Sequence, residues 1–137
     1  ADIVSLHVPY MPATHHLMNQ RTFRLMKRGS LLINTARGGL VDTASLVQAL
    51  DEGRLGGAGL DVLEGEELVK EERQLLSKDF PKQKLATALR NHILLHRENV
   101  VITPHIAFDS TEALQRILDT TVTNIAGFLS GAPVNLV

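Results

Sequence analysis

Four short apolar segments constrain the fold of this 137-residue sequence more than any other feature. They span residues 3–8, 31–33, 58–62 and 100–102, and the third is interrupted by a glycine. Segments that are short and apolar at nearly every position are typical of strands buried on both faces of a parallel sheet. We therefore expect a parallel sheet with helices packed on its faces.

Helix signals lie between these segments. Asn19 is placed to cap a helix that extends to about residue 27 and stops at Gly29. Asp42 is placed to cap a second helix, which ends at Gly53 and carries apolar residues at helical spacing. Strands that alternate with helices predict an α/β protein with a doubly wound sheet.

The last part of the sequence predicts a long amphipathic helix. Asp109, with Glu112 three residues later, has the spacing of a capping box, and Gly131 is placed to end the helix. One face of this helix is apolar, with Leu114, Ile117, Leu118, Val122, Ile125 and Leu129.

Residues 63–99 have no clear period. The segment is highly charged and contains Pro81, and it predicts a loop with one or two short helices. It is longer than the usual connection between elements, which favours a functional or lid-like role.

Polar residues follow three of the predicted strands at the points where the strands end. Arg37 follows the second, Asp61 and Glu66 follow the third, and His105 follows the fourth. The carboxyl ends of parallel strands meet at one edge of a sheet, and ligands of doubly wound sheets bind there. The pattern therefore predicts an active site built from these residues.

Composition excludes several other classes. Fourteen Lys and Arg balance fifteen Asp and Glu, so the sequence does not provide the basic surface that nucleic acid binding requires. The apolar segments are far shorter than the roughly 20 residues that span a bilayer, so we expect no membrane partner. The sequence has no cysteine, which excludes disulfides, thiolate metal sites and a cysteine nucleophile.

Three ordered motifs give the sequence a resemblance to a known family. The first motif spans residues 26–42, where an apolar strand is followed by Asn34, by Arg37-Gly38 and by Leu40-Val41-Asp42. Residues 59–66 and residues 103–108 form the second and third motifs. Residues 6–9, with Thr14, match an earlier strand and loop. With these motifs the sequence resembles the D-isomer-specific 2-hydroxyacid dehydrogenases, and the motifs extend over nearly the whole chain.

The resemblance implies an architecture and a cofactor. Residues 1–108 would form the C-terminal part of a Rossmann-type dinucleotide-binding domain, and residues 109–137 a helix and tail that return to a substrate domain. The cofactor would be NAD, and the complete enzyme would be a cytoplasmic homodimer. The glycine-rich phosphate loop of such domains is expected upstream, because residues 53–59, although rich in glycine, precede a strand.

The resemblance also assigns catalytic roles. His105 would be the acid/base, Glu66 its partner and Arg37 the anchor of the substrate carboxylate. A histidine suits proton transfer near neutral pH, because its reference pKa is about 6.5. A neighbouring carboxylate favours the imidazolium, and the guanidinium of an arginine can bind a carboxylate through two parallel hydrogen bonds.

The nicotinamide end of NAD would contact residues after three of the strands. The family uses the carboxylate equivalent to Asp61 and the backbone at Thr35 and Ala36, beside Arg37, to hold the carboxamide. Further cofactor contacts are assigned to Val8, Pro9 and Thr14.

Some assignments keep alternatives. Glu64 and Glu67 flank Glu66, and a cluster of charges is usually a solvated surface. His92 and His96 have the spacing of a metal pair, but no third ligand is evident and we expect no metal. His15 and His16 have no carboxylate near them in the sequence, so we expect no catalytic role for them.

The function indicated is hydride transfer between NAD(H) and a small D-2-hydroxy acid or 2-keto acid. The Glu64-Gly65-Glu66 sequence, the long segment before His105 and the aromatic Phe108 favour D-lactate and pyruvate. Two alternatives are a non-enzymatic, dinucleotide-binding relative that resembles a transcriptional co-repressor, and an inactive truncated fragment of the dehydrogenase.

Overall fold

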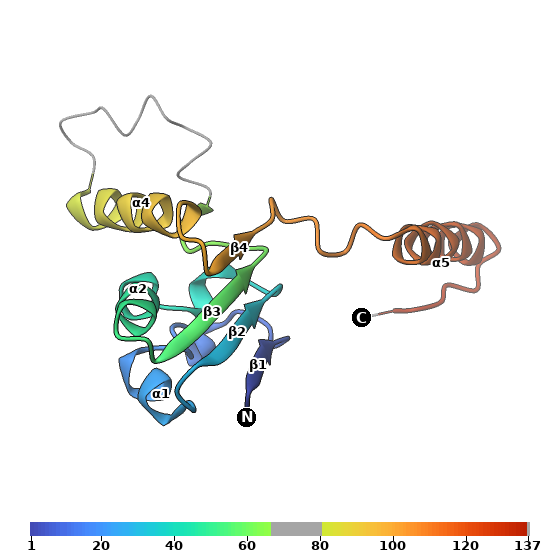
Figure 1. The fold of residues 1–137 in the computed structure, drawn as a ribbon. Helices are drawn as coiled ribbons and strands as arrows, with labels where there is room; N and C mark the ends of the chain where they lie inside the picture. Colours follow the sequence, from blue (N-terminus) through green and yellow to red (C-terminus); the bar gives the residue numbers. More distant parts are fainter. Residues whose placement is uncertain (67–80, 137) are drawn as a thin grey trace. The chain divides into compact units, whose positions relative to one another are not determined.

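The computed structural model describes residues 1–66 and 81–136. It consists of two compact units, Ala1–His105 and Ile106–Val137. The first unit contains a four-stranded sheet with helices, and the second contains a long helix (Figure 1).

The sheet consists of β1 (Ile3–Leu6), β2 (Ser30–Asn34), β3 (Leu55–Leu60) and β4 (Val100–Ile102). Their spatial order follows the sequence, and each neighbouring pair is parallel. The four strands and their parallel arrangement confirm the prediction. Because all four run in one direction, their carboxyl ends lie at the same edge of the sheet.

β3 starts three residues earlier than predicted and contains most of the glycine-rich stretch. The prediction that residues 53–59 precede a strand is therefore wrong. A Cβ atom on Gly56 would lie 2.6 Å from the carbonyl oxygen of Gly29, and one on Gly57 would lie 2.7 Å from that of Asn99. These glycines allow neighbouring backbone to approach the strand closely.

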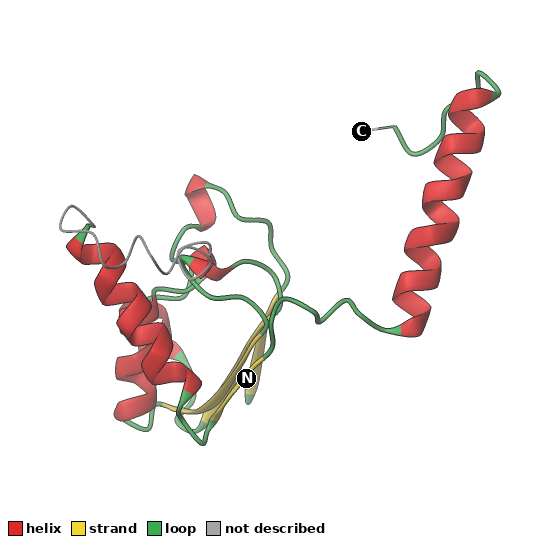
Figure 2. Ribbon diagram, turned by 90° about the horizontal axis from the view of Figure 1, so that it is seen from above, coloured by secondary structure: helices red, strands yellow, loops and turns green. Residues whose placement is uncertain are grey.

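Helices α1 (Gln20–Leu25), α2 (Thr43–Asp51) and α4 (Lys82–Leu95) lie on one side of the sheet, with α2 packed against both of the others (Figure 2). Both predicted caps are confirmed. The Asn19 side chain accepts hydrogen bonds from the backbone N–H groups of Arg21 and Thr22, and the Asp42 side chain accepts one from Ala44.

The two faces of the sheet are buried to different degrees. Leu32 and Leu60, on the face toward the helices, are almost fully buried. On the opposite face Ile3, Leu31 and Val101 are 58%, 39% and 67% exposed. The expectation that every strand is buried on both faces is therefore wrong for this chain, because the described helices of the first unit pack on one face.

α4 differs from the loop with short helices predicted for residues 63–99. It has 14 residues and buries Asn91 and Leu94, the latter completely. The remainder of that charged segment, residues 67–80, lies outside the described residues.

The second unit is built around α5 (Thr111–Leu129). Ser110, one residue after the predicted Asp109, is its N-cap and accepts a hydrogen bond from the backbone of Ala113. Asp109 instead closes a turn, in which its backbone N–H donates to the carbonyl of Ile106. Gly131 follows the helix with a φ of +74°, as its predicted stop role requires. None of the described helices is both long and apolar enough to cross a membrane.

Candidate active site

At the carboxyl edge of the sheet, backbone hydrogen bonds join the segments that follow β2, β3 and β4. The N–H of Asp61 donates to the carbonyl of Asn34 (2.9 Å), and the N–H of Thr103 donates to that of Leu60 (3.0 Å). The N–H of His105 then donates to the carbonyl of Asp61 (2.9 Å). The segments that carry the predicted site residues are thus held side by side beyond the ends of β2, β3 and β4.

The Glu66 carboxylate lies against the ring of His105. Oε1 of Glu66 lies 3.2 Å from Nδ1 of His105, and the side chains are 38% and 47% exposed. Oε2 of Glu66 accepts a hydrogen bond from the N–H of Leu63 (3.2 Å). Nδ1 is therefore the ring nitrogen that meets the Glu66 carboxylate, and Nε2 is directed elsewhere. The structure therefore brings together two of the three predicted catalytic side chains.

The backbone of His105 is in a strained conformation. Its φ is +59°, in the left-handed region that non-glycine residues seldom adopt. Its N–H donates to the carbonyls of Asp61 and Thr103, which fixes the residue in this conformation. Strain of this kind is concentrated at functional sites.

Arg37 follows β2 and directly precedes the short 3-10 helix η2 (Gly38–Leu40). The side chain of Asn34, which is 1% exposed, folds the connection: its Nδ2 donates to the carbonyl of Arg37 (2.9 Å), and its Oδ1 accepts from the N–H of Ala36 (3.1 Å). The guanidinium of Arg37 is exposed, and its Nη1 donates to the Ala36 carbonyl. Asn34 thus positions the backbone of Arg37. The sequence motif contains Asn34, but its pattern did not predict this role.

Gly38 explains how the Arg37 connection meets the turn that carries Glu66. A Cβ atom on Gly38 would lie 2.0 Å from the carbonyl oxygen of Leu63 and 2.5 Å from the backbone nitrogen of Glu64. The glycine therefore allows a close backbone approach to the turn of residues 63–66, here called the 63–66 turn.

The residues predicted to hold the nicotinamide fall into two groups. Asp61 is 5% exposed and accepts a hydrogen bond from the hydroxyl of Thr103, and Thr35 and Ala36 lie in the neighbouring connection after β2. A buried carboxylate beside backbone amide groups can hold a carboxamide, because the carboxamide has both donors and an acceptor. The carboxylate and the backbone groups at this edge therefore fit the carboxamide at the nicotinamide end of NAD.

The second group lies in the loop after β1, which contains the 3-10 helix η1 (Pro12–Thr14). The hydroxyl of Thr14 donates to the carbonyl of Pro9 (2.8 Å) and accepts from the N–H of Met11 (2.9 Å), which shapes the loop. Val8 is 39% exposed at its start. The structure brings Pro9 and Thr14 together, and β1 pairs with β2, so this loop begins beside the strand that leads to Arg37.

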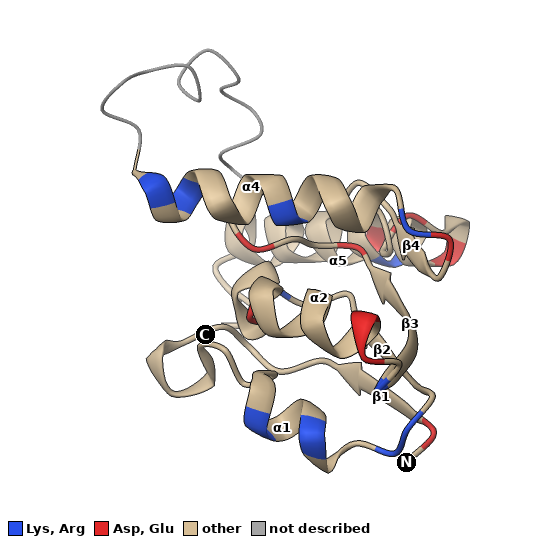
Figure 3. Cartoon of the chain, turned by 60° about the vertical axis from the view of Figure 1, so that its left-hand side comes forward, with Lys and Arg blue, Asp and Glu red and all other residues tan. Residues whose placement is uncertain are grey.

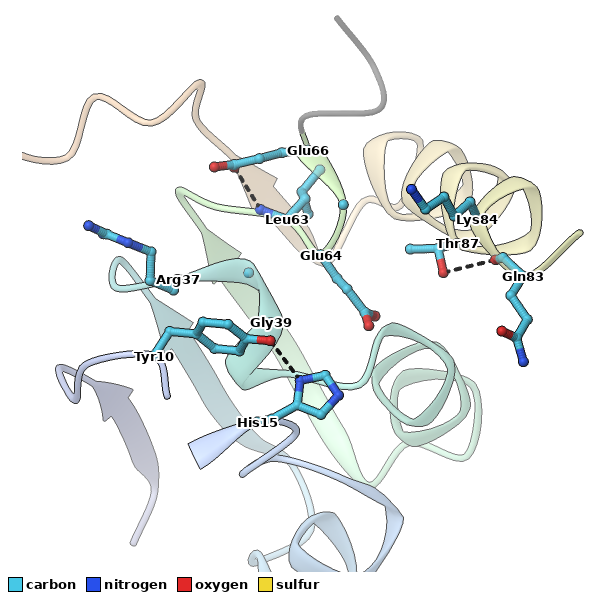
Figure 4. A pocket seen from close by; sticks show the side chains of 12 residues that line it. Tyr10, His15, Arg37, Gly39, Leu63, Glu64, Glu66, Gln83, Lys84 and Thr87 are labelled. Carbon is cyan, nitrogen blue, oxygen red and sulfur yellow. Dashed lines mark hydrogen bonds between the residues drawn. The ribbon is translucent and has the colours of Figure 1, made fainter. Parts of the chain in front are cut away.

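A cavity of about 390 Å³ opens beside Arg37 and Glu66 (Figure 4). Its wall also contains Tyr10, His15, Gln83, Lys84 and Thr87, none of which was predicted as a site residue. Tyr10 donates toward or accepts from Nδ1 of His15 (3.1 Å), and its ring lies against Gly39. These residues come from the loop after β1 and from α4, so only the tertiary fold places them here.

Glu64 is a structural residue and not part of a solvated charged surface. Its Oε2 accepts from the hydroxyl (2.7 Å) and the N–H (3.1 Å) of Thr43, and its Oε1 lies 2.7 Å from Nε2 of His16. No carboxylate lies near His15 and His16 in the sequence, but the fold brings Glu64 to His16. Glu67, the other alternative to Glu66, lies outside the described residues.

The spaced histidines of α4 contact one another. The rings of His92 and His96 are 4.4 Å apart, and Nδ1 of His96 lies 2.8 Å from the carbonyl of His92. Within residues 1–66 and 81–136, no group of three or more His, Cys, Asp or Glu is arranged to hold a metal.

Figure 3 shows basic residues on α1 and α4 and acidic residues on nearby turns, so charges of both signs are interspersed.

Comparisons with known proteins agree with this geometry. Residues 1–107 match the model of the D-isomer specific 2-hydroxyacid dehydrogenase NAD binding domain. The chain is 45% identical over 128 residues to a D-specific alpha-keto acid dehydrogenase of Enterococcus faecalis, covering 93% of this chain and 38% of that protein. It is 40% identical over 137 residues to a glycerate dehydrogenase of Methylorubrum extorquens, covering all of this chain and 38% of that protein.

A solved structure is also similar. The crystal structure of a D-lactate dehydrogenase from Aquifex aeolicus, complexed with NAD and lactic acid, matches with a TM-score of 0.77 and 41% identity, covering 96% of this chain and 38% of that one. The chain therefore spans a little over a third of the length of these relatives. The family match, the parallel sheet and the ordered motifs together show that the chain belongs to the D-isomer-specific 2-hydroxyacid dehydrogenase family, whose NAD-binding domain residues 1–107 match.

Proposed function

We propose that this chain supplies the acid/base and substrate-anchoring residues of an NAD-dependent D-2-hydroxyacid dehydrogenase. The reaction transfers a hydride between NAD(H) and a D-2-hydroxy acid or 2-keto acid pair. The observation that carries the proposal is the contact between the side chains of Glu66 and His105, with Oε1 and Nδ1 3.2 Å apart at the carboxyl edge of a parallel sheet.

His105 is the acid/base of the proposal. With Nδ1 directed to Glu66, Nε2 donates a proton to the carbonyl oxygen as a keto acid is reduced, and it removes that proton when the hydroxy acid is oxidised. The Glu66 carboxylate stabilises the imidazolium and holds the ring in one orientation. The backbone bond from His105 to the Asp61 carbonyl fixes the base of the side chain.

Arg37 is the substrate anchor. Its exposed guanidinium carries a permanent charge and two parallel donors, which match a carboxylate. As negative charge develops on the carbonyl oxygen, the same cation stabilises it. Asn34 holds the backbone of Arg37, so a hydrogen bond from a buried residue sets the direction in which the Arg37 side chain leaves the sheet.

The cofactor is held at its nicotinamide end by Asp61, Thr35 and Ala36, beside Arg37, and by the loop with Val8, Pro9 and Thr14. NADH, when bound, supplies the hydride. In this arrangement the Asp61 carboxylate accepts from the N–H groups of the carboxamide, and the backbone at Thr35 and Ala36 supplies the remaining contacts.

D-Lactate and pyruvate are the substrate pair that the sequence favours. Support comes from the Glu64-Gly65-Glu66 sequence, from Phe108 and from the similarity to a solved D-lactate dehydrogenase. A relative of comparable identity is a glycerate dehydrogenase, so the assay must compare pyruvate with hydroxypyruvate. Assembly as a homodimer, a cytoplasmic location, and residues 1–108 and 109–137 as the parts of two domains remain predictions.

The test uses the complete protein and its His105→Gln variant. We expect NADH-dependent reduction of pyruvate by the wild type and a loss of about 10²–10⁴-fold in kcat in the variant, which is the usual contribution of a general acid–base group. NADH affinity should be nearly unchanged. Binding of NADH without turnover of any 2-keto acid would instead indicate a non-enzymatic dinucleotide-binding protein.

A further inference from the structure

The 63–66 turn carries two glutamates that face different surroundings. Glu66 is paired with His105 at the sheet edge. Glu64 points away from Glu66, and its side chain is 23% exposed (Figure 4). The turn is therefore held on one side by Glu64 while it presents Glu66 on the other.

Glu64 is bonded to three segments that are distant from it in the sequence. Its carboxylate contacts His16, in the loop after β1, and Thr43, the first residue of α2. Its backbone carbonyl accepts a hydrogen bond (2.9 Å) from Nδ2 of Asn91, a residue of α4 that is 2% exposed. Bonds to an ionised acceptor are stronger than those between neutral groups, so the carboxylate is the main polar anchor of the turn.

Two hydrogen bonds lie within the turn itself. The N–H of Glu66 lies 3.2 Å from the carbonyl of Leu63, and the N–H of Leu63 lies 3.2 Å from Oε2 of Glu66. Both bonds join residues of the turn to one another, so neither fixes the turn to another element. The position of Glu66 relative to His105 therefore depends on anchors outside the turn.

His16 is itself fixed for this contact. Its φ is +50°, its N–H donates to the carbonyl of Gly39, and its carbonyl accepts from Nδ2 of Asn19. Its ring stacks on that of His15 with centroids 3.8 Å apart. A residue held in a strained conformation by several bonds is a rigid partner for Glu64.

We propose that Glu64 is a positioning residue of the active site: with His16 and Thr43, it holds the 63–66 turn where the Glu66 carboxylate meets His105. This inference rests on the proposed function, because its effect on rate passes through the Glu66–His105 pair. It assigns a role to a histidine and a glutamate that act through Glu66.

The test compares Glu64→Ala and Glu64→Gln in the complete protein, with Glu52→Ala as the control. Glu52 is an exposed glutamate that accepts a side-chain hydrogen bond from Gln48, away from the sheet edge. We expect Glu64→Ala to lower kcat for keto-acid reduction by about 10- to 100-fold, as a displacement of about 1 Å does. The KM for NADH should stay within about twofold of wild type. Glu64→Gln should recover much of the rate, because its amide oxygen still accepts from Thr43.

A double-mutant cycle separates positioning from general destabilisation. In the Glu66→Gln background, Glu64→Ala should cause little further loss of kcat, because the carboxylate that it positions is absent. Independent, additive losses would overturn the proposal. If Glu64→Ala does not fold, His16→Asn takes its place, since asparagine tolerates a positive φ; a folded His16→Asn variant with wild-type kcat would also overturn it.

A readout that needs no turnover separates this inference from the proposed function. In protein labelled with ¹⁵N-histidine, the ring signals of His105 are assigned by their loss in His105→Gln. Glu64→Ala should move these signals in the same direction as Glu66→Gln, whether or not pyruvate is reduced. Unchanged His105 signals in Glu64→Ala would refute positioning, whereas absence of turnover in the wild type would refute the proposed function.

Discussion

Gly38→Ala tests whether backbone packing between two connections sets the geometry of the site. In the structure the new Cβ would lie 2.0 Å from the carbonyl oxygen and 2.1 Å from the carbonyl carbon of Leu63. Ordinary van der Waals contact begins at 3.4 Å, so the Arg37 connection and the 63–66 turn must separate by about 1.4 Å, the difference between 3.4 and 2.0 Å. Both contacts are backbone atoms, so no side-chain rotation relieves the clash.

The separation should affect stability and rate together. Overpacking of this kind costs about 1–3 kcal/mol in the free energy of unfolding. A displacement of about 1 Å between Glu66 and His105 should lower kcat by about 10²-fold. Thermal unfolding and steady-state reduction of pyruvate by the complete protein measure the two effects.

Gly59→Ala is the matched control for Gly38→Ala. Its Cβ would lie 3.0 Å from Cδ1 of Ile33, the end of a flexible side chain, so the clash can be relieved without moving backbone. We expect a smaller loss of stability and little change in kcat. If Gly38→Ala and Gly59→Ala had the same kcat, close packing at Gly38 would have no part in positioning Glu66.

Three further predictions concern the chemistry. Arg37→Lys in the complete protein should raise the KM for the keto acid steeply and lower kcat, because lysine keeps the charge and loses the paired donors; unchanged pyruvate kinetics would mean that another residue binds the carboxylate. Glu66→Gln should lower kcat for keto-acid reduction and leave the KM for NADH nearly unchanged, because the His105 ring loses the carboxylate that orients it; an unchanged kcat would separate Glu66 from His105. Residues 1–137 alone should bind NADH weakly and reduce no pyruvate, because the sequence contains no G-x-G-x-x-G turn to bind the pyrophosphate; micromolar binding by fluorescence titration, with turnover, would show that the cofactor site has been misplaced.

Elements with local signals could be predicted from the sequence. Asn19 and Asp42 cap their helices as expected, because a cap is a hydrogen bond between a side chain and backbone two or three residues away. The cap of α5 was predicted one residue early, since Asp109 and Ser110 both have suitable side chains. The turn that ends at Asp109 decides between them, and it is formed with Ile106.

Burial of the sheet could not be predicted from the strands themselves. An apolar run indicates what a strand can bury, whereas burial also requires an element on each face. Leu31 and Leu32 are neighbours of the same type, yet the first is 39% exposed and the second is fully buried. The difference follows from the side of the sheet on which α1, α2 and α4 pack.

The site shows the same division between local and tertiary information. Arg37, Asp61 and His105 were found because each follows a strand, and the parallel register places the ends of those strands together. Glu66 was chosen over Glu64 only through the family resemblance, since both lie in one short charged segment. The fold separates them: Glu64 is bonded to Thr43 and His16, and Glu66 is paired with His105. Neither Thr43 nor His16 carries a sequence signal for this contact, because its partner is 21 residues away in one case and 48 in the other. A motif that is contiguous in the sequence can therefore identify the reacting groups. The residues that hold those groups in place come from distant parts of the chain, so they can be identified only in the folded structure.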